Sequence, residues 1–376
     1  MSYDIVIIGG GINGAACAEQ LSEAGYKVLV LEQHHQAGLA TSSKSSKLIH
    51  GGLRYLESAQ FKLVHECLQQ RKYLLKQYPE LVKLVPFHIP IYDDGHRASW
   101  QIRLGLSIYS LFSLKLFKTI NKNKWQQLDN LKTNKLKSVF QYYDGQTNDT
   151  LLTQRVMQQA QDNGAELMTD ACFVSAQCND DLCAIKYRQQ GKIHDIASQI
   201  IINATGPWVN HVLHNIMPAQ SQVNIELIAG THIIVPGKLT QGMYYLEAPQ
   251  DRRAVFVMPW TSQTGEDQIL IGTTETLFKG SPETVAPTED EIEYLLQVYN
   301  HYFTSAINRS KVIDSYTGLR VLPANDDSAF NRSRDTIIHY NHTEKPKVFS
   351  IYGGKLTAHR TTSQQVVRKI TQYLKK

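Results

Sequence analysis

The sequence lacks the long uncharged apolar stretch that a membrane-spanning helix requires. The nearest approach, Leu104–Leu114, is shorter than the roughly 20 residues needed and is bounded by Arg103 and Lys115. The start of the chain also lacks the basic and apolar segments of a secretory signal peptide. We therefore expect a cytoplasmic protein that does not span a membrane, with peripheral attachment to the cytoplasmic face left open.

Cysteine spacing typical of metal sites is also missing. The cysteines are Cys17, Cys67, Cys172, Cys178 and Cys183, and they include no C-x-x-C pair. Their spacing matches no zinc or iron–sulfur pattern, so we expect no metal. An odd number without a disulfide framework is typical of reduced thiols in the cytosol. We expect all five to be structural and reduced.

A large excess of charge of one sign is absent. The 39 Lys and Arg residues exceed the 34 Asp and Glu residues only slightly, which gives a formal net charge of +5. This excess is compatible with an anionic ligand but is too small to indicate nucleic-acid binding. Apolar residues make up 42% of the chain, enough for an ordinary buried core.

The N-terminal segment, in contrast, carries a specific pattern. Ile5–Ile8 is continuously apolar, as expected for a strand buried on both faces of a parallel sheet. Gly9, Gly11 and Gly14 follow as G-x-G-x-x-G and lead into a helix, and Glu32 stands at the end of a second strand. This order predicts a Rossmann-like dinucleotide site, with the pyrophosphate at the helix N-terminus and Glu32 on a ribose hydroxyl.

The rest of the chain alternates between helical and extended patterns. Apolar periodicity predicts helices over Phe61–Gln77, Ser99–Lys118, Thr150–Asp162, Glu289–Phe303 and Lys355–Leu374. Longer strand patterns predominate from about residue 223 to residue 338. They indicate a mostly antiparallel second domain.

The glycine motif does not distinguish FAD from NAD, but later segments do. Thr41–Glu57 reads TSSKSSKLIHGGLRYLE and resembles the aerobic, FAD-dependent glycerol-3-phosphate dehydrogenases, which belong to the D-amino-acid-oxidase-like flavoproteins. The resemblance continues through Asn203–Trp208 (NATGPW), Arg253–Trp260 (RAVFVMPW) and Gly353–Thr357 (GGKLT). It extends over nearly the whole chain.

The resemblance implies an α/β fold with two domains. A Rossmann-like FAD-binding domain is expected from residues 1–75, 140–215 and 343–376. A mostly antiparallel α+β substrate domain is expected from residues 76–139 and 216–342. The helical C-terminal domain of the family is expected to be absent.

The resemblance also implies FAD as cofactor and oxidation of sn-glycerol 3-phosphate to dihydroxyacetone phosphate, by hydride transfer to flavin N5. Quinone or another acceptor would take the electrons. The residues implied for FAD are Gly9, Gly11, Asn13, Gly14, Glu32, Thr41, Ser42, Ser46, Lys47, Leu48, His50, Gly52, Phe173, Ala204, Thr205, Gly206, Gly353, Gly354, Lys355, Leu356 and Thr357.

Cations should hold the substrate, because a phosphate monoester is close to a dianion and arginine binds its oxygens bidentately. The residues implied are Arg54, Tyr55, Arg253, Arg320, Arg334 and Lys355. Oxidation of the alcohol also needs a base. His50 and His232 are the candidates, with Lys355 available to stabilise the developing oxyanion, and the sequence does not choose between the histidines.

Two other functions stay open at this point. A D-amino-acid-oxidase-like or 2-hydroxy-acid oxidoreductase would need only one or two arginines for a carboxylate. A flavin-binding scaffold or subunit with little turnover is the other alternative, because the helical C-terminal domain of the family is expected to be absent. Whether the chain forms a homodimer is also open.

One segment indicates a membrane surface. Lys115–Lys137 contains seven lysines and a single acid, directly after an apolar helix. Such a segment suits attachment to an anionic bilayer, where quinone dissolves. The alternative is a solvated loop beside a core helix.

Overall fold

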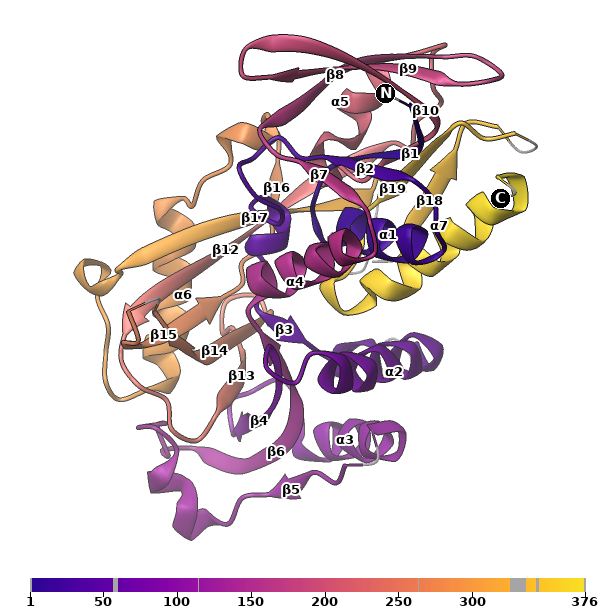
Figure 1. The fold of residues 1–376 in the computed structure, drawn as a ribbon. Coiled ribbons are helices and arrows are strands. Elements are labelled where there is room, and N and C mark those ends of the chain that lie inside the picture. Colours follow the sequence, from indigo (N-terminus) through magenta and orange to yellow (C-terminus); the bar gives the residue numbers. More distant parts are fainter. Residues whose placement is uncertain are drawn as a thin grey trace.

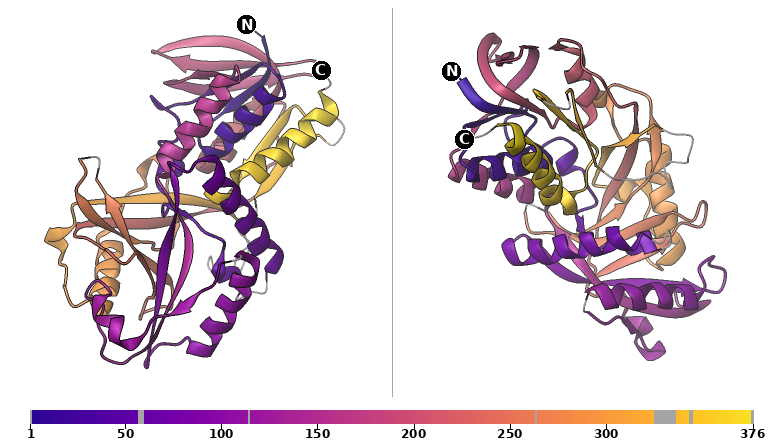
Figure 2. Two further views of the ribbon diagram at one scale, coloured as in Figure 1. Left: turned by 60° about the horizontal axis from the view of Figure 1, so that its bottom comes forward. Right: turned by 90° about the vertical axis from the view of Figure 1, so that its right-hand side faces the viewer.

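The computed structural model describes residues 2–56, 60–113, 115–262, 264–324, 336–342 and 345–374. Of residues 54 and 55 only the backbone is described. The described chain forms two large sheets, one at each end of the molecule, with helices against both (Figure 1). Figure 2 shows the same arrangement from two further sides, with α2 and α3 stacked along one flank.

The first sheet contains nine strands among the described residues. They are β1 (Ser2–Ile8), β2 (Val28–Leu31), β7 (Glu166–Met168), β8 (Ala171–Cys178), β9 (Cys183–Gln189), β10 (Lys192–Asn203), β11 (Ile216–Met217), β18 (Ile337–Tyr340) and β19 (Val348–Tyr352). The centre is parallel, in the order β19, β10, β1, β2 and β7. Parallel strands of this kind need helices or other elements over both faces.

The apolar run of β1 is explained by burial on both sides. Ile5 and Ile7 pack against α1 (Ile12–Glu23), α4 (Asp149–Asp162) and α7 (His359–Tyr373). Val6 and Ile8 face the opposite side, toward α5 (Val209–His214) and the β8–β9 hairpin. Since successive side chains of a strand point to opposite faces, only a continuous apolar run fills both cores.

The second sheet contains ten strands among the described residues. They are β3 (Leu48–Ile49), β4 (Val82–Tyr92), β5 (Lys118–Thr119), β6 (Leu136–Thr147), β12 (Ile225–Pro236), β13 (Met243–Glu247), β14 (Ala254–Thr261), β15 (Asp267–Gly272), β16 (Thr276–Phe278) and β17 (Asp314–Pro323). Every pairing among them is antiparallel except β13 with β4. One face packs on α6 (Glu289–Tyr302), and the other on α2 (Phe61–Gln77) and α3 (Ser99–Ser113).

Some of the expected helix ends differ from the structure, and α3 shows the largest difference. The helix expected to continue to Lys118 ends at Ser113, and Lys118–Thr119 is a short strand paired with β6. The domain boundaries expected from the sequence stay predictions; in the structure β6 pairs with β4 from Leu136 to Thr147.

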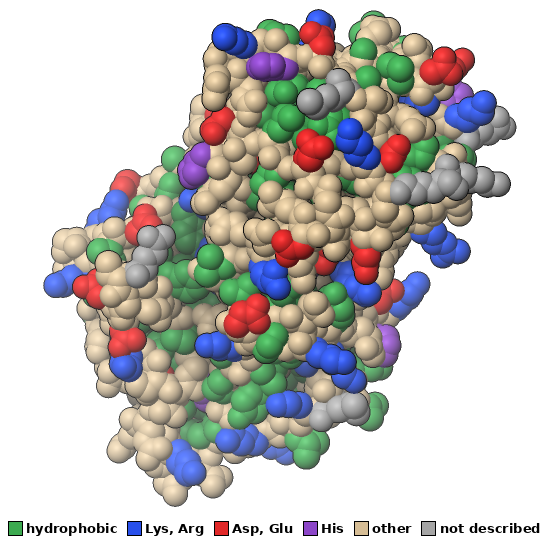
Figure 3. Space-filling model, viewed as in Figure 1, with side chains coloured by type: hydrophobic (Ala, Val, Ile, Leu, Met, Phe, Trp, Pro, Cys, Tyr) green, Lys and Arg blue, Asp and Glu red, His purple; other side chains and the backbone are tan. Residues whose placement is uncertain are grey.

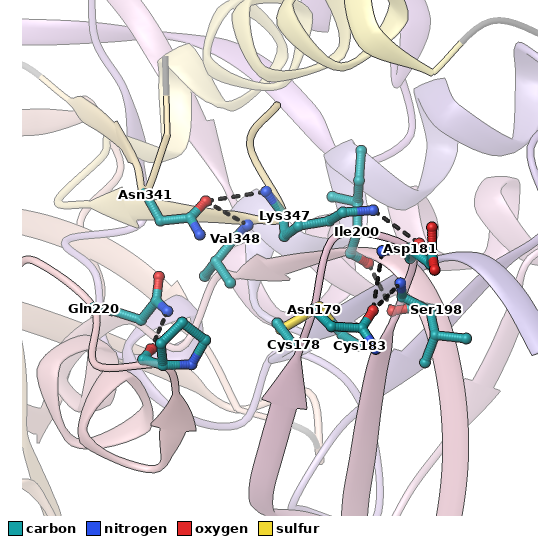
Figure 4. The surroundings of a disulfide bond; sticks show 12 residues. Cys178, Asn179, Asp181, Cys183, Ser198, Ile200, Gln220, Asn341, Lys347 and Val348 are labelled. Carbon is teal, nitrogen blue, oxygen red and sulfur yellow. Dashed lines mark hydrogen bonds between the residues drawn. A yellow bond between two sulfur atoms is a disulfide. The ribbon is translucent and has the colours of Figure 1, made fainter. Parts of the chain in front are cut away.

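The expectation of five reduced cysteines is wrong for one pair. Cys178 and Cys183 lie opposite each other in the β8–β9 hairpin, with a Cα–Cα distance of 4.0 Å, and form a disulfide (Figure 4). The turn between them is tight, because the Asn179 side chain accepts hydrogen bonds from the backbone of Asp181 and Leu182. Two cysteines that flank such a turn are brought together by the hairpin itself. Cys17, Cys67 and Cys172 are not part of a disulfide.

No helix in the described part of the chain is long and apolar enough to cross a membrane. Among the same residues, no cluster of three or more His, Cys, Asp or Glu side chains is arranged to hold a metal ion.

Candidate functional site

A cavity of about 500 Å³ lies between the two sheets. Its wall is formed by the glycine-rich turn after β1, the end of β2, the segment after Ala40, and the turn between β19 and α7. Strands β12 and β17 close the far side. Every residue that the sequence predicts for the cofactor lines this cavity except Gly14 and Lys47. The segments are far apart in the chain, so the fold alone brings them together.

The glycine-rich turn has the geometry of an anion site. Gly9 has a φ of +102°, which glycine adopts readily and other residues rarely do. A Cβ on Gly14 would lie 2.0 Å from the carbonyl oxygen of Gly9, so this position serves close packing of α1 on β1 rather than ligand contact. A Cβ on Gly11 would meet only the Ser42 hydroxyl, at 3.1 Å. The N-terminus of α1 is therefore open toward the cavity for a pyrophosphate.

Glu32 is buried at the end of β2 and lines the cavity. One carboxylate oxygen accepts a hydrogen bond from the backbone N–H of Gly10 at 2.7 Å, and the other accepts one from His34 at 2.8 Å. These bonds fix the carboxylate beside the glycine-rich turn. An ionised oxygen keeps further acceptor capacity for a ribose hydroxyl.

Lys47 has a different place from the one expected. Its ammonium lies 2.6 Å from Asp149 and also donates to the carbonyl of Ser43. Burial lowers the pKa of Lys47, and the pairing with Asp149 offsets this only in part. Asp149 in turn accepts hydrogen bonds from the backbone and hydroxyl of Ser45. This placement favours a role in shaping the loop over a contact of the ammonium with the cofactor.

His232 lies on β12 and lines the cavity. Its ring stacks on Tyr316 at 4.9 Å, and its Nε2 is 2.9 Å from the hydroxyl of Ser46. Its Nδ1 is buried without a partner. Burial, with the positive charges of Arg320 and Lys47, lowers the pKa of His232 to about 3. The ring is therefore neutral at neutral pH, and one nitrogen is able to accept a proton.

Two of the predicted arginines reach the same cavity. The guanidinium of Arg320 lies 3.3 Å from the carboxylate of Glu275, and Arg253 donates to the backbone carbonyl of Glu275. Arg253 also pairs with Asp251 at 3.1 Å. The side chain of Glu275 is only 6% exposed, whereas that of Arg320 is 30% exposed. Glu275, which lies in the short segment between β15 and β16, was missed from the sequence.

The remaining predicted substrate residues divide into two groups. His50 and Lys355 line the cavity. The side chains of Arg54 and Tyr55 and the whole of Arg334 lie outside the described residues. Their roles stay predictions.

A buried polar cluster next to His50 was also missed from the sequence. Asp144 accepts hydrogen bonds from Arg71 at 2.7 Å, from the Tyr109 hydroxyl at 2.9 Å and from the Gly51 backbone at 3.0 Å. All three side chains are buried. Because Gly51 follows His50 directly, this cluster fixes the loop that carries His50. Nothing in the spacing of these residues signals the contact, since they come from α2, α3 and β6.

The residues present fit a flavin dinucleotide. Asn13, in the first turn of α1, donates to the carbonyl of Gly353 at 3.2 Å, while its own carbonyl oxygen is buried without a partner. A Cβ on Gly354 would lie 2.5 Å from the Asn13 amide nitrogen. The start of α1 thus touches the turn after β19. An unpartnered buried acceptor beside two glycines is suited to a polar cofactor that passes both.

Comparison with known proteins agrees with this geometry. The FAD dependent oxidoreductase family matches residues 4–360 of the chain. The aerobic glycerol-3-phosphate dehydrogenase of Escherichia coli (strain K12) is 36% identical over 374 residues, which cover 98% of this chain and 74% of the relative. The D-erythritol 1-phosphate dehydrogenase of Brucella abortus (strain 2308) is 33% identical over 376 residues, which cover 98% and 73%.

Solved structures show the same fold. The L-alpha-glycerophosphate oxidase of Mycoplasma pneumoniae with FAD bound superposes with a TM-score of 0.79 at 20% identity, over 99% of this chain and 95% of that chain. The glycine oxidase of Geobacillus kaustophilus superposes with a TM-score of 0.73 at 17% identity, over 99% and 95%. The fold class predicted from the sequence is therefore confirmed.

Proposed function

The chain belongs to the family of FAD-dependent oxidoreductases, with FAD as its cofactor, and from this premise we propose that it oxidises sn-glycerol 3-phosphate to dihydroxyacetone phosphate. One observation carries the proposal: the same cavity as that of the cofactor residues is lined by Arg253, Arg320, Lys355, His50 and His232. When bound, the flavin supplies the hydride acceptor.

The arginines bind the phosphate in this proposal. A guanidinium and a phosphate oxygen 4 Å apart attract each other by about 4 kcal/mol at an effective dielectric of 20. Arg253 lies directly before β14 and Arg320 lies on β17, so that a phosphate between them is held from two segments of the chain. Arg54 and Arg334, whose side chains are not described, are proposed to add to this set.

The proton of the substrate hydroxyl goes to a histidine. His232 is neutral and is therefore in the form that accepts a proton. The charge of Arg320 is one cause of its low pKa, after burial. A phosphate dianion on Arg320 offsets that charge, so substrate binding raises the pKa of His232 toward the value a general base needs. His50 is the other candidate, and Lys355 is proposed to stabilise the oxyanion.

A panel of substrates tests the proposal against its alternatives. Purified holoenzyme is supplied with an artificial electron acceptor and with glycerol 3-phosphate, D-erythritol 1-phosphate, glycerol or D-alanine. The proposal requires the highest kcat/KM for glycerol 3-phosphate. A higher value for D-erythritol 1-phosphate would keep the polyol phosphate class and change the substrate. A higher value for D-alanine would support the amino-acid oxidase alternative, and no turnover on any would support the scaffold.

We further propose quinone as acceptor and attachment to an anionic membrane surface. The outer side of α3 and the following segment expose Trp100, Leu104, Leu111 and Leu116, whose exposed fractions are 66, 55, 74 and 87%. Figure 3 shows hydrophobic side chains beside Lys and Arg side chains over the end of the molecule that carries α2 and α3. Apolar side chains beside lysines suit the interface of an anionic bilayer.

Vesicle co-sedimentation tests the membrane contact. The protein should pellet with anionic vesicles at low salt and be released at high salt, because salt screens the lysines. Equal binding to neutral vesicles would contradict the proposal.

A further inference from the structure

A buried carboxylate stands behind the cavity wall and does not line the cavity. Glu291 lies in the first turn of α6 and is 9% exposed. Together with Thr288 it forms a capping box, in which the Thr288 hydroxyl and the Glu291 carboxylate each bond the backbone of the other residue. A capping box accounts for only one bond to the carboxylate. Glu291 accepts several more.

Three threonine hydroxyls from outside the helix also donate to Glu291. Thr274 and Thr276 donate to one carboxylate oxygen at 2.9 and 3.1 Å, and Thr231 donates to the other at 2.7 Å. Burial on its own would raise the pKa of Glu291, but the hydroxyl donors lower it, so the group stays ionised. An ionised acceptor makes stronger hydrogen bonds than a neutral one. The network is therefore a firm connection between α6 and the strands beside it.

The threonines belong to the segments that form the substrate side of the cavity. Thr231 stands directly before His232 on β12, and its hydroxyl is 2.6 Å from that of Thr317 on β17, the strand that carries Arg320. Thr274 and Thr276 flank Glu275, which contacts both Arg320 and Arg253. One carboxylate thus bonds β12, Thr274 and the start of β16 directly, and it reaches β17 through the contact between Thr231 and Thr317.

We propose that Glu291 is a positioning residue for the substrate, which holds Glu275 and β17 so that Arg253 and Arg320 converge on one anionic group. The inference rests on the proposed function, because it takes that group to be the substrate phosphate. A residue that only caps α6 would bond Thr288 and no residue outside this helix start. The bonds to Thr231, Thr274 and Thr276 run instead to the wall that carries the arginines.

The test compares Glu291→Gln with Thr288→Ala. A glutamine keeps the size of the side chain but has one oxygen instead of two, so it cannot serve both the loop threonines and Thr231. Thr288→Ala removes the cap of the same helix, including the contact of the Thr288 hydroxyl with Glu291, and leaves the three wall threonines in place. The affinity for glycerol 3-phosphate is measured as a ligand-induced shift of the melting temperature and as the KM, with FAD content as a control.

We expect Glu291→Gln to weaken glycerol 3-phosphate binding about tenfold through misplaced arginines, while FAD content and the limiting rate of flavin reduction stay near the parent values. Thr288→Ala should melt earlier but keep the parent affinity.

Thr274→Val, which removes a single wall hydroxyl, should reproduce the loss of affinity if Glu291→Gln does not fold. Parent affinity in Glu291→Gln or in Thr274→Val would overturn the inference. If glycerol 3-phosphate neither shifts the melting temperature of the parent protein nor is turned over by it, the proposed function is wrong. This outcome is distinct from a failure of the inference about Glu291.

Discussion

The two ends of the cavity are built in different ways. The nucleotide end is made mainly of backbone: the glycine turn, the N-terminus of α1 and the turn after β19. The substrate end is made of side chains that stand on separate strands and are held by buried carboxylates. A backbone site depends on a few glycines and tolerates most other changes. A side-chain site depends on each member of its hydrogen-bond network.

The largest effect is expected at Gly14, because it would break the nucleotide end. In Gly14→Ala the new methyl group meets the carbonyl oxygen of Gly9, a backbone atom that cannot rotate away. The turn must shift, at a cost of roughly 3 kcal/mol, and FAD should be lost. FAD content and thermal unfolding measure the effect.

Gly105→Ala is the matched control for this change. It also adds a methyl group to a helical glycine, but nothing lies within 4 Å of the new atom. It should retain FAD and gain up to about 1 kcal/mol. Full FAD occupancy in both variants would contradict the packing role of Gly14.

Arg320→Ala should break the substrate end and leave the nucleotide end intact. Loss of one charge-assisted contact, worth about 1.5–3 kcal/mol, predicts flavin reduction by glycerol 3-phosphate weakened about 10- to 100-fold with FAD still bound. Arg320→Lys should recover only part of the loss, because an ammonium does not reproduce the planar fork. Rapid-mixing kinetics under anaerobic conditions measure both.

The control for Arg320 is Arg309→Ala. Arg309 also pairs with a glutamate, Glu289, through two contacts of 2.7 and 2.8 Å, but on the surface. Its removal should leave both the melting temperature and the reduction rate close to the parent values, because exposed ion pairs contribute little to stability. An Arg320→Ala protein that melts early but is reduced at the parent rate would assign Arg320 to the structure rather than to the substrate.

A pH titration compares the stability of the parts of the protein around the two sheets. Burial lowers the pKa of His88 in the second sheet, and that of His359 at the start of α7, to about 4. Both are neutral in the folded chain and gain protons on unfolding below about pH 6.5. The stability they contribute is therefore complete above pH 6.5 and is lost as the pH falls toward 4, by up to about 3 kcal/mol for each group.

Calorimetry between pH 7 and pH 4 measures this loss. Replacement of either histidine by glutamine should flatten the pH dependence by that histidine's share. A melting temperature that stays constant from pH 6.5 to pH 4.5 would contradict the account. Two separate transitions at low pH would show that the parts of the protein around the two sheets unfold independently.

The glycine-rich turn and its acid can be recognised in the sequence because their determinants are local. Gly9, Gly11 and Glu32 lie within one βαβ unit, and their spacing is set by the geometry of the turn and helix. The continuous apolar run of β1 likewise reports its burial on both faces. The antiparallel second sheet was visible in the strand pattern, but its helix ends and the extent of β6 were not.

The supports of the substrate end are not local, and the sequence does not reveal them. In the sequence, the pattern around Glu291 indicates an ordinary helix cap. Asp144 is one of several polar residues at the end of a strand. Their contacts arise only when strands distant in the chain are adjacent in the sheet. The Cys178–Cys183 pair is a different case, because a tight turn between two strands could have indicated it.

The central claim, that an anionic substrate is held next to the flavin, is tested most directly by an anaerobic titration. Glycerol 3-phosphate is added to the purified yellow holoprotein while the flavin absorbance is recorded, and glycerol is added to a second sample. The account predicts that glycerol 3-phosphate bleaches the flavin at stoichiometric to low millimolar concentration, roughly the range of ordinary KM values, and that glycerol does not. A flavin that stays oxidised with glycerol 3-phosphate, or that glycerol reduces equally well, would contradict it.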